Sequence, residues 1–120
     1  MALLRQSVNK TIFPSTAETI GATSTYKTLT DDMGNYSTIT VQLNVTAVSS
    51  SDTIALQIQD SPDGTNFDDI SGASLAGAAT TGIRTIRVSA YSKYIRAKVT
   101  GATVDSTATF TYSIVATFKS

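Results

Sequence analysis

The chain has 120 residues, which suits one domain with its own hydrophobic core, and its nine basic residues balance nine acidic ones. It contains no histidine, cysteine or tryptophan, and this excludes disulfides, thiolate chemistry and imidazole metal sites or proton shuttles. The neutral balance gives no electrostatic footprint for nucleic acid or an anionic membrane, so we expect neither as a partner.

Residues 1–22 show no sustained periodicity, and Pro14 among Thr and Ser residues disfavours a helix. We therefore predict an extended N-terminal arm over residues 1–22 and one β-sandwich domain over residues 23–120. We expect the apolar residues of the arm to be buried, either against the chain's own sandwich or against a neighbouring subunit. The residues expected to make this contact are Leu3, Leu4, Ile12 and Phe13.

The start of the chain lacks the apolar stretch and the cleavage site of a secretory signal. No apolar run approaches the about 18 to 20 residues that a membrane helix requires. We therefore expect a soluble protein that is made in the cytoplasm without export.

The most regular strands are predicted over residues 38–47 and 107–118, where apolar residues alternate mostly with Thr, Ser, Asn or Gln. A polar connection then leads to residues 54–59, which alternate in the same way. We expect this strand to pair with residues 38–47 as an antiparallel hairpin. The inward residues of the two long strands are predicted to be Ile39, Val41, Leu43, Val45, Ala47, Ala108, Phe110, Tyr112, Ile114, Ala116 and Phe118.

Residues 61–66, with the letters SPDGTN, predict a chain reversal, because Pro fixes φ and Asp and Gly favour turn geometry. Asp68 and Asp69 then break the alternation of the next strand, which indicates a bulge or a sheet edge. The small residues of 72–82 predict a long mobile loop. With further strands near residues 85–88 and 94–99, the chain is predicted to be all-β, an antiparallel, jelly-roll-like β-sandwich with an extended N-terminal arm.

Four acids, Asp60, Asp63, Asp68 and Asp69, gather around the reversal and could offer oxygens to calcium. Their spacing does not match an EF-hand loop, so a solvated turn is the favoured interpretation and we expect no metal or cofactor. A glycosidase pair is not supported, since no aromatic sugar platform lies beside these acids in the sequence. With no nucleophile, base or metal constellation visible, we expect no enzyme.

Arg87, Arg96 and Lys98 are predicted to share the outward face of two neighbouring strands, with Tyr94 beside them. A nucleic-acid strip would need more length and repeated aromatic residues. Two interpretations remain, a solvated strand face or an interface strip. As an interface, the strip would meet the acidic turn of another copy, at Asp63 and Asp68, in a head-to-tail contact.

Residues 58–70, IQDSPDGTNFDDI, resemble the S-x-DGT-x-F/W hairpin of small β-sandwich virion proteins of tailed bacteriophages. Residues 93–102, KYIRAKVTGA, followed by a long Thr-rich strand, are similar to the end of those domains, so that the resemblance spans residues 41–118. It implies a head decoration or cement protein on the lattice of the major capsid protein, often as a trimer or other homo-oligomer. Such a protein is synthesised in the host cytoplasm and resides on the capsid surface of the virion. A tail or neck component is the alternative within the same class.

A rival of a different class is a carbohydrate-binding or adhesin-like β-sandwich module. Such a module would present tyrosines in one plane as sugar platforms. The residues available for this purpose are Tyr26, Tyr36, Tyr91 and Tyr94.

Overall fold

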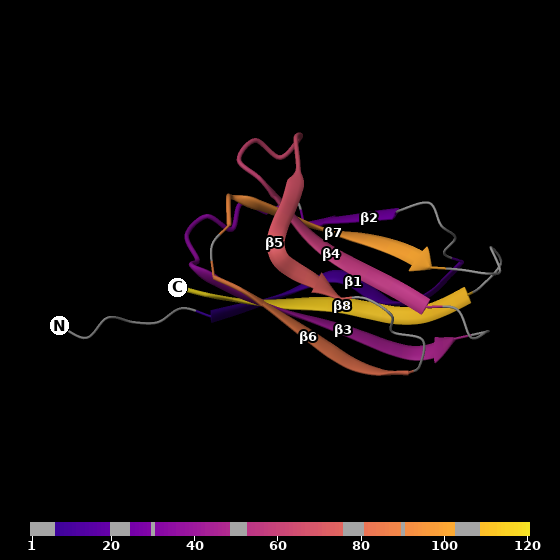
Figure 1. The fold of residues 1–120 in the computed structure, drawn as a ribbon. Helices are drawn as coiled ribbons and strands as arrows, with labels where there is room; N and C mark the ends of the chain where they lie inside the picture. Colours follow the sequence, from indigo (N-terminus) through magenta and orange to yellow (C-terminus); the bar gives the residue numbers. More distant parts are fainter. Residues whose placement is uncertain are drawn as a thin grey trace.

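The computed structural model describes residues 7–19, 25–29, 31–48, 53–75, 81–89, 91–102 and 109–120. Within these ranges the secondary structure consists of eight strands in two four-stranded antiparallel sheets (Figure 1). No helix among the described residues is long and apolar enough to cross a membrane. The strands are β1 (Ser7–Thr19), β2 (Thr25–Leu29), β3 (Thr38–Val48), β4 (Thr53–Ser61), β5 (Asp68–Leu75), β6 (Gly82–Val88), β7 (Tyr94–Ala102) and β8 (Thr109–Lys119).

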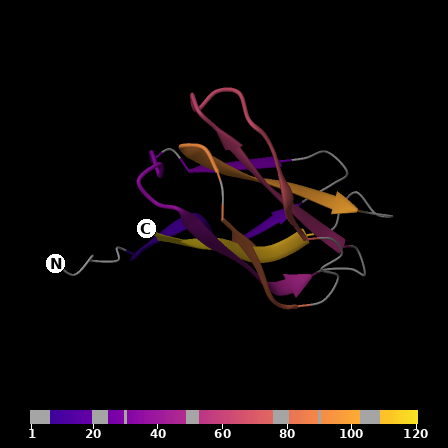
Figure 2. The ribbon, with the colours of Figure 1, turned by 60° about the vertical axis from the view of Figure 1, so that its left-hand side comes forward.

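The first sheet has the strand order β1-β8-β3-β6, and the second sheet has the order β2-β7-β4-β5. Except between β4 and β5, each strand along the chain lies in the other sheet from the strand before it. This is the arrangement of a double-sheet jelly roll, and Figure 2 shows the two layers facing one another. The predicted all-β, jelly-roll-like sandwich is confirmed.

The core lies between the sheets and follows the period-two pattern of the strands. Five alternate residues of β8, from Phe110 to Phe118, are fully buried, as are alternate residues of β3. Ala47 was expected to point inward but is exposed, because the register of β3 on β8 shifts between Val45 and Ala47. Ala108 lies outside the described residues. The second sheet contributes chiefly Ile54, Leu56, Ile58, Ile95, Ala97 and Val99.

Residues 7–19 differ from the predicted arm, because they form β1, which pairs with β8 from Ser7↔Lys119 to Thr19↔Thr109. The register shifts on both sides of Phe13, and Pro14 has no N–H to donate. These irregularities explain why the segment shows no regular alternation. Ile12 and Phe13 pack on the chain's own core, one of the two kinds of cover expected. Leu3 and Leu4 lie outside the described residues.

One prediction about strand pairing and one about a loop were wrong. β3 lies between β8 and β6, whereas β4 lies between β7 and β5 in the other sheet, so β3 and β4 form no hairpin. An alternating pattern specifies which face of a strand is buried, and two such strands can face each other across the core instead of pairing. Residues 72–75 belong to β5 and not to a loop, while residues 76–80 lie outside the described ranges.

The irregularity predicted near Asp68 and Asp69 is present, because β5 is an edge strand whose register on β4 shifts between Gln57 and Gln59. Gly72 has a φ of +79° within β5. The Gln57 amide nitrogen donates to the carbonyl oxygens of Ile70 and Ala73, at 3.0 and 3.3 Å, and so satisfies backbone groups at the irregular stretch.

Candidate functional site

The outer face of the first sheet, here called the polar face, carries mostly neutral side chains in rows across the strands. One row places Asn9, Thr117, Thr40 and Arg87 side by side, and the Thr117 hydroxyl donates to Asn9 Oδ1 at 2.7 Å. β3, β6 and β8 contain no acidic residue. The next rows consist of Thr11, Val115, Gln42 and Thr85, and then of Ser113, Asn44 and Ile83.

Threonine suits this face, because its branched β-carbon packs well on a pleated surface and its hydroxyl pairs across strands. Charged residues are depleted at the centres of protein interfaces, where they would lose their hydration. The strands β3, β6 and β8 therefore share with the centres of protein interfaces a lack of carboxylates.

The hairpin between β4 and β5 is held together by Asp63. Its Oδ1 accepts hydrogen bonds from Ser61 Oγ at 2.7 Å and from the backbone N–H groups of Thr65 and Asn66 at 2.8 and 2.9 Å. These bonds, led by the one from Asn66 N–H, hold the pKa of Asp63 far below its usual range. Gly64 adopts a φ of +78°, which favours glycine. The SPDGTN letters therefore encode the turn itself.

The other three acids have separate partners. Asp60 accepts from the Ser92 N–H at 2.7 Å, and Asp69 accepts from Gln59 Nε2 at 2.6 Å. Asp68 is exposed and accepts from the N–H of Asp69. No group of three or more acidic or other metal-binding side chains converges in the described part of the chain, so the calcium alternative gains no support.

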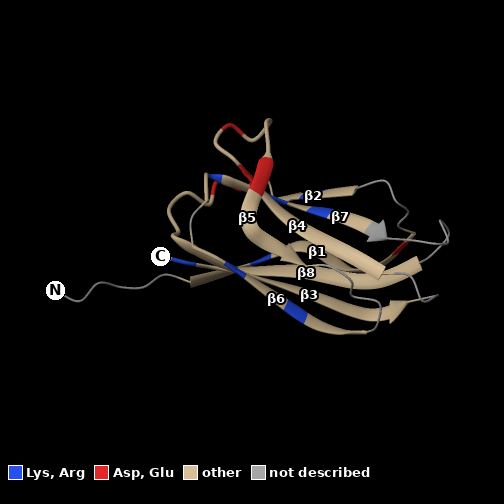
Figure 3. Ribbon diagram, viewed as in Figure 1, with Lys and Arg blue, Asp and Glu red and all other residues tan. Residues whose placement is uncertain are grey.

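The predicted basic strip is not assembled. Arg96, Lys98 and Tyr94 lie on the outer side of β7 in the second sheet, whereas Arg87 lies on β6 in the first sheet. β6 and β7 follow one another in sequence, but the jelly roll places them in different layers. Figure 3 shows the basic residues spread over both sheets and acidic residues gathered near the β4–β5 hairpin.

Arg96 is the centre of a stacked group on the outer face of the second sheet. Its guanidinium lies 4.1 Å from the ring centroid of Tyr26 and 4.4 Å from that of Phe67. Its Nε donates to Gln59 Oε1 at 2.6 Å, which fixes the guanidinium over the sheet. The group thereby joins β2, β7 and β4 to the hairpin.

A shallow cavity of about 210 Å³ lies beside this group. Tyr94 forms part of its wall, and the ring lies about 3.5 Å from the position that a Cβ on Gly64 would take. The structure thus brings Tyr94 and Asp63, two of the predicted interface residues, to one place. The cavity is lined by Thr28, Leu29, Asp63, Gly64, Phe67 and Tyr94.

The four tyrosines proposed as sugar platforms do not lie in one exposed plane. Tyr26 is 47% exposed, but Tyr36 and Tyr91 pack against the ring of Phe118, with ring centroids 6.1 and 6.3 Å away. The Tyr91 hydroxyl lies 2.9 Å from the carbonyl oxygen of Met33, to which it donates. Burial raises the pKa of Tyr91 to about 12. Two of the four therefore serve as structural anchors.

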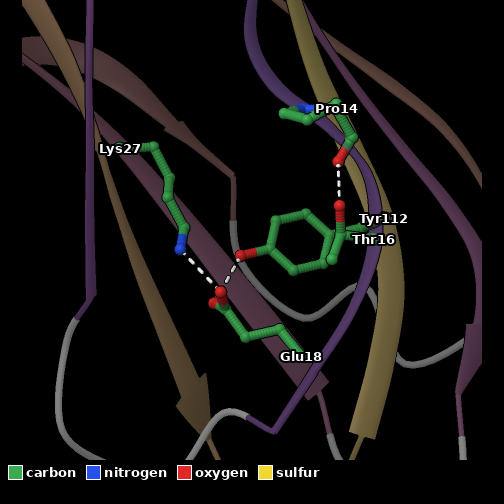
Figure 4. A network of polar contacts seen from close by, with 5 residues as sticks. All are labelled: Pro14, Thr16, Glu18, Lys27 and Tyr112. Carbon is green, nitrogen blue, oxygen red and sulfur yellow. Dashed lines mark hydrogen bonds and ion pairs between the residues drawn. The ribbon is translucent and has the colours of Figure 1, made fainter.

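A polar network between β1, β2 and β8 was not foreseen from the sequence (Figure 4). Glu18 accepts from the Tyr112 hydroxyl at 2.9 Å and forms an ion pair of 2.6 Å with Lys27. The Lys27 ammonium also lies 4.3 Å from the ring centroid of Phe13. Burial and the bond to Glu18 raise the pKa of Tyr112 well above its ordinary value.

Two signals in the sequence point to this network. Glu18 is the only glutamate of the chain, and Lys27 occupies an inward position between Thr25 and Leu29 in the alternation of β2. The side chains of Glu18, Lys27 and Tyr112 bind one another, which fits a structural clamp between the sheets.

No family model matches the chain, and no curated protein matches it. Among solved structures, the PBSX exported protein XepA superposes with a TM-score of 0.62 at 11% identity, over 93% of this chain and 36% of that chain. The VP2 subviral particle of infectious bursal disease virus superposes with a TM-score of 0.58 at 8% identity, over 96% of this chain and 32% of that chain. A Bacillus endospore appendage protein, from a family of disulfide-linked pili, superposes with a TM-score of 0.55 at 12% identity. This match covers 96% of this chain and 89% of that chain.

The chain spans about a third of the length of the XepA and VP2 chains. At such low identities the likeness establishes the fold alone. The chain is a β-sandwich module of a kind that also occurs in a virus particle protein and in a pilus protein.

Proposed function

We propose that this chain is a structural protein of a tailed-bacteriophage virion, a decoration or cement protein that binds the major capsid protein at the capsid surface. The polar face is the observation that carries the proposal. Its central strands β3 and β8 present Thr, Ser, Asn and Gln side chains without a single carboxylate. Burying a surface of this kind against another subunit costs little desolvation free energy, because no carboxylate has to be dehydrated.

The fold and the hairpin motif add support. VP2 of a subviral particle and a pilus protein share the jelly roll, and both belong to large protein assemblies. The SPDGTN hairpin resembles that of small phage virion proteins, and its acid Asp63 is engaged in holding the turn. We also propose a non-enzymatic role, and the same contacts support it, since Asp60, Asp63 and Asp69 each hold a structural hydrogen bond.

The first test is whether the chain is present, by mass spectrometry, in density-purified virions of the phage whose genome encodes it. Its absence from such particles would overturn the proposal. The second test is rebinding of purified protein to particles depleted of it.

For the rebinding test, Gln42→Glu with Asn44→Asp places two carboxylates at the centre of the polar face without changing side-chain size. We expect the double variant to bind at least about tenfold more weakly, because a charge is desolvated on binding. A control, Asn35→Asp with Thr65→Asp, adds the same charge at exposed positions outside the face and should bind like the wild type. If the wild type, the double variant and the control bind the particles equally well, the polar face is not the surface that contacts the capsid.

A carbohydrate-binding module is the second candidate, and the exposed Tyr26 next to the cavity near Phe67 favours it. This candidate predicts that the isolated protein binds soluble oligosaccharides in calorimetry and that Tyr26→Ala weakens the binding. Retention of capsid binding by Tyr26→Ala, with no heat from oligosaccharides, would reject it.

A further inference from the structure

Four strands lie at the edges of the two sheets, and an edge strand exposes unpaired backbone groups that can bind another strand. Three of the four carry features that discourage this. β1 contains Pro14 and two register shifts, and β5 contains a register shift and Asp68 with Asp69. β2 has only five residues and points Lys27 inward.

β6 also has a charged residue, Arg84, at an inward position, but it has the longest uninterrupted ladder of the four edge strands. Its seven residues pair with β3 in continuous register from Ile39↔Val88 to Val45↔Gly82, without a bulge or a proline. It is rich in β-branched residues, which favour strand pairing. No described strand lies beside its outer edge within the first sheet. Of the four edges, this one is the best prepared to accept a further strand.

The outward-facing side chains of β6 differ between its two ends. Near its start, Ile83 is 58% exposed, the largest exposure of any large apolar side chain in the described part of the chain. Near its end, Arg87 lies at the rim of a cavity of about 430 Å³ that extends over β3 and β8, away from the free edge. Ile83 and Arg87 both belong to the outward-facing residues of β6, and they lie four positions apart.

We infer that β6 binds β6 of a second copy of this chain, antiparallel and centred on Thr85, to form a two-fold symmetric dimer with a continuous first sheet. In this register Ile83 of each copy lies opposite Arg87 of the other. Each exposed isoleucine can thus pack along the aliphatic part of an Arg87 side chain, and the contact is made twice by symmetry.

The charges of β6 agree with this register. Arg87 lies opposite Ile83 of the second copy and Arg84 lies opposite Ile86, so no two arginines face one another directly. Thr85 lies opposite Thr85, a favourable cross-strand pair. The rows of the polar face would then run on into the second copy. This inference does not depend on the proposed function, because it concerns the free protein.

The full-length protein should sediment as a dimer at high concentration and dissociate reversibly on dilution. Ile83→Lys should weaken the dimer at least about tenfold, because a lysine on an edge strand opposes pairing and would face Arg87. Thr11→Lys adds the same residue to an exposed position of β1 and should leave the dimer unchanged. A wild-type monomer at every concentration, a trimer, or a dimer indifferent to Ile83→Lys would overturn the inference.

The register can be tested separately, because the chain has no cysteine of its own. Facing Cβ atoms in an antiparallel pair are about 4.5 to 5.5 Å apart, close to what a disulfide requires. Under mild oxidation Thr85→Cys should therefore form a linked dimer faster than Ile83→Cys, whose copies face Arg87 instead. Equal rates for the two variants would exclude pairing centred on Thr85.

Discussion

The two long sides of the sandwich are closed in different ways. Where β1 and β2 meet, Glu18 and Lys27 bridge the sheets together with Tyr112, and the ring of Phe13 lies 4.7 Å from that of Tyr112. Where β5 and β6 meet, a cavity of about 340 Å³ remains between the strands, lined in part by Ala73 and Val88.

Side-chain size explains the difference. β1 supplies Phe13 and Glu18, which are long enough to span the gap, whereas β5 supplies Ser71, Gly72 and Ala73. A jelly roll with one continuous core can thus be sealed on one side by its own side chains and keep a cavity on the other side.

Both sides depend on the shared centre of the core, so the largest effect is expected there. Ile114 is fully buried on β8, where it pairs with Phe13 of β1 and Leu43 of β3. Ile114→Ala should lower the free energy of unfolding by about 2 to 5 kcal/mol, because it removes buried methyl groups and leaves a cavity. Urea denaturation provides the measurement. A loss near zero would mean that this face of β8 is not buried.

Adding volume should distinguish the two sides. Ala116 is fully buried between β1 and β3, and Ala116→Val should cost about 1 to 3 kcal/mol through overpacking. Ala73 is equally buried but borders the open cavity, so Ala73→Val should cost less than about 1 kcal/mol. The shift of the denaturant unfolding midpoint measures the stability loss of each variant. The comparison fails if the two substitutions cost the same.

The clamp on the β1–β2 side should have a smaller effect. Glu18→Gln removes the carboxylate that partners the Lys27 ammonium, while the amide can still accept from the Tyr112 hydroxyl. We expect a loss of about 1 to 2 kcal/mol, since a partly buried cation loses its partner. Lys10→Gln, which breaks the more exposed ion pair with Asp31, serves as a control and should have less effect.

The smallest effect is expected at acid pH, from the hairpin that leads into β5. The pKa of Asp63 is lowered in the folded state, so the stability that its ionised form contributes is complete above its unfolded value of 3.8. That contribution is lost as the pH falls below this value towards the folded pKa. The wild-type melting temperature should therefore fall more steeply below about pH 4 than that of Asp63→Asn. Parallel curves would show that Asp63 does not hold the turn.

The sequence predicts strands and buried faces better than it predicts their neighbours. The alternation around Ile39 and Phe110 identifies the inward residues, and the SPDGTN letters identify the turn, because both depend on local geometry. Which strand lies beside which depends on contacts that are remote in sequence. For this reason the expected pairing of β3 with β4 and the grouping of Arg87 with Arg96 were wrong.

The clamp escaped prediction for a related reason. Glu18 belongs to a strand whose alternation is interrupted near Pro14, and its partner Tyr112 appears in the sequence only as one more inward residue of β8. The contact between Glu18 and Tyr112 can be inferred only when the register of β1 on β8 is known. Likewise, the absence of a bulge in β6 becomes meaningful only when β6 is known to be an edge.

The position of β8 between β1 and β3 also determines how the protein folds. Asn9 and Thr117, which are joined by a hydrogen bond, are 108 residues apart. Such distant pairing must overcome a large loop-closure entropy, and proteins dominated by it fold in milliseconds to seconds. On the ribosome, β1 and β3 emerge well before the strand that joins them. β3 can pair with β6 earlier, but the first sheet cannot be completed until residues 109–119 have left the exit tunnel.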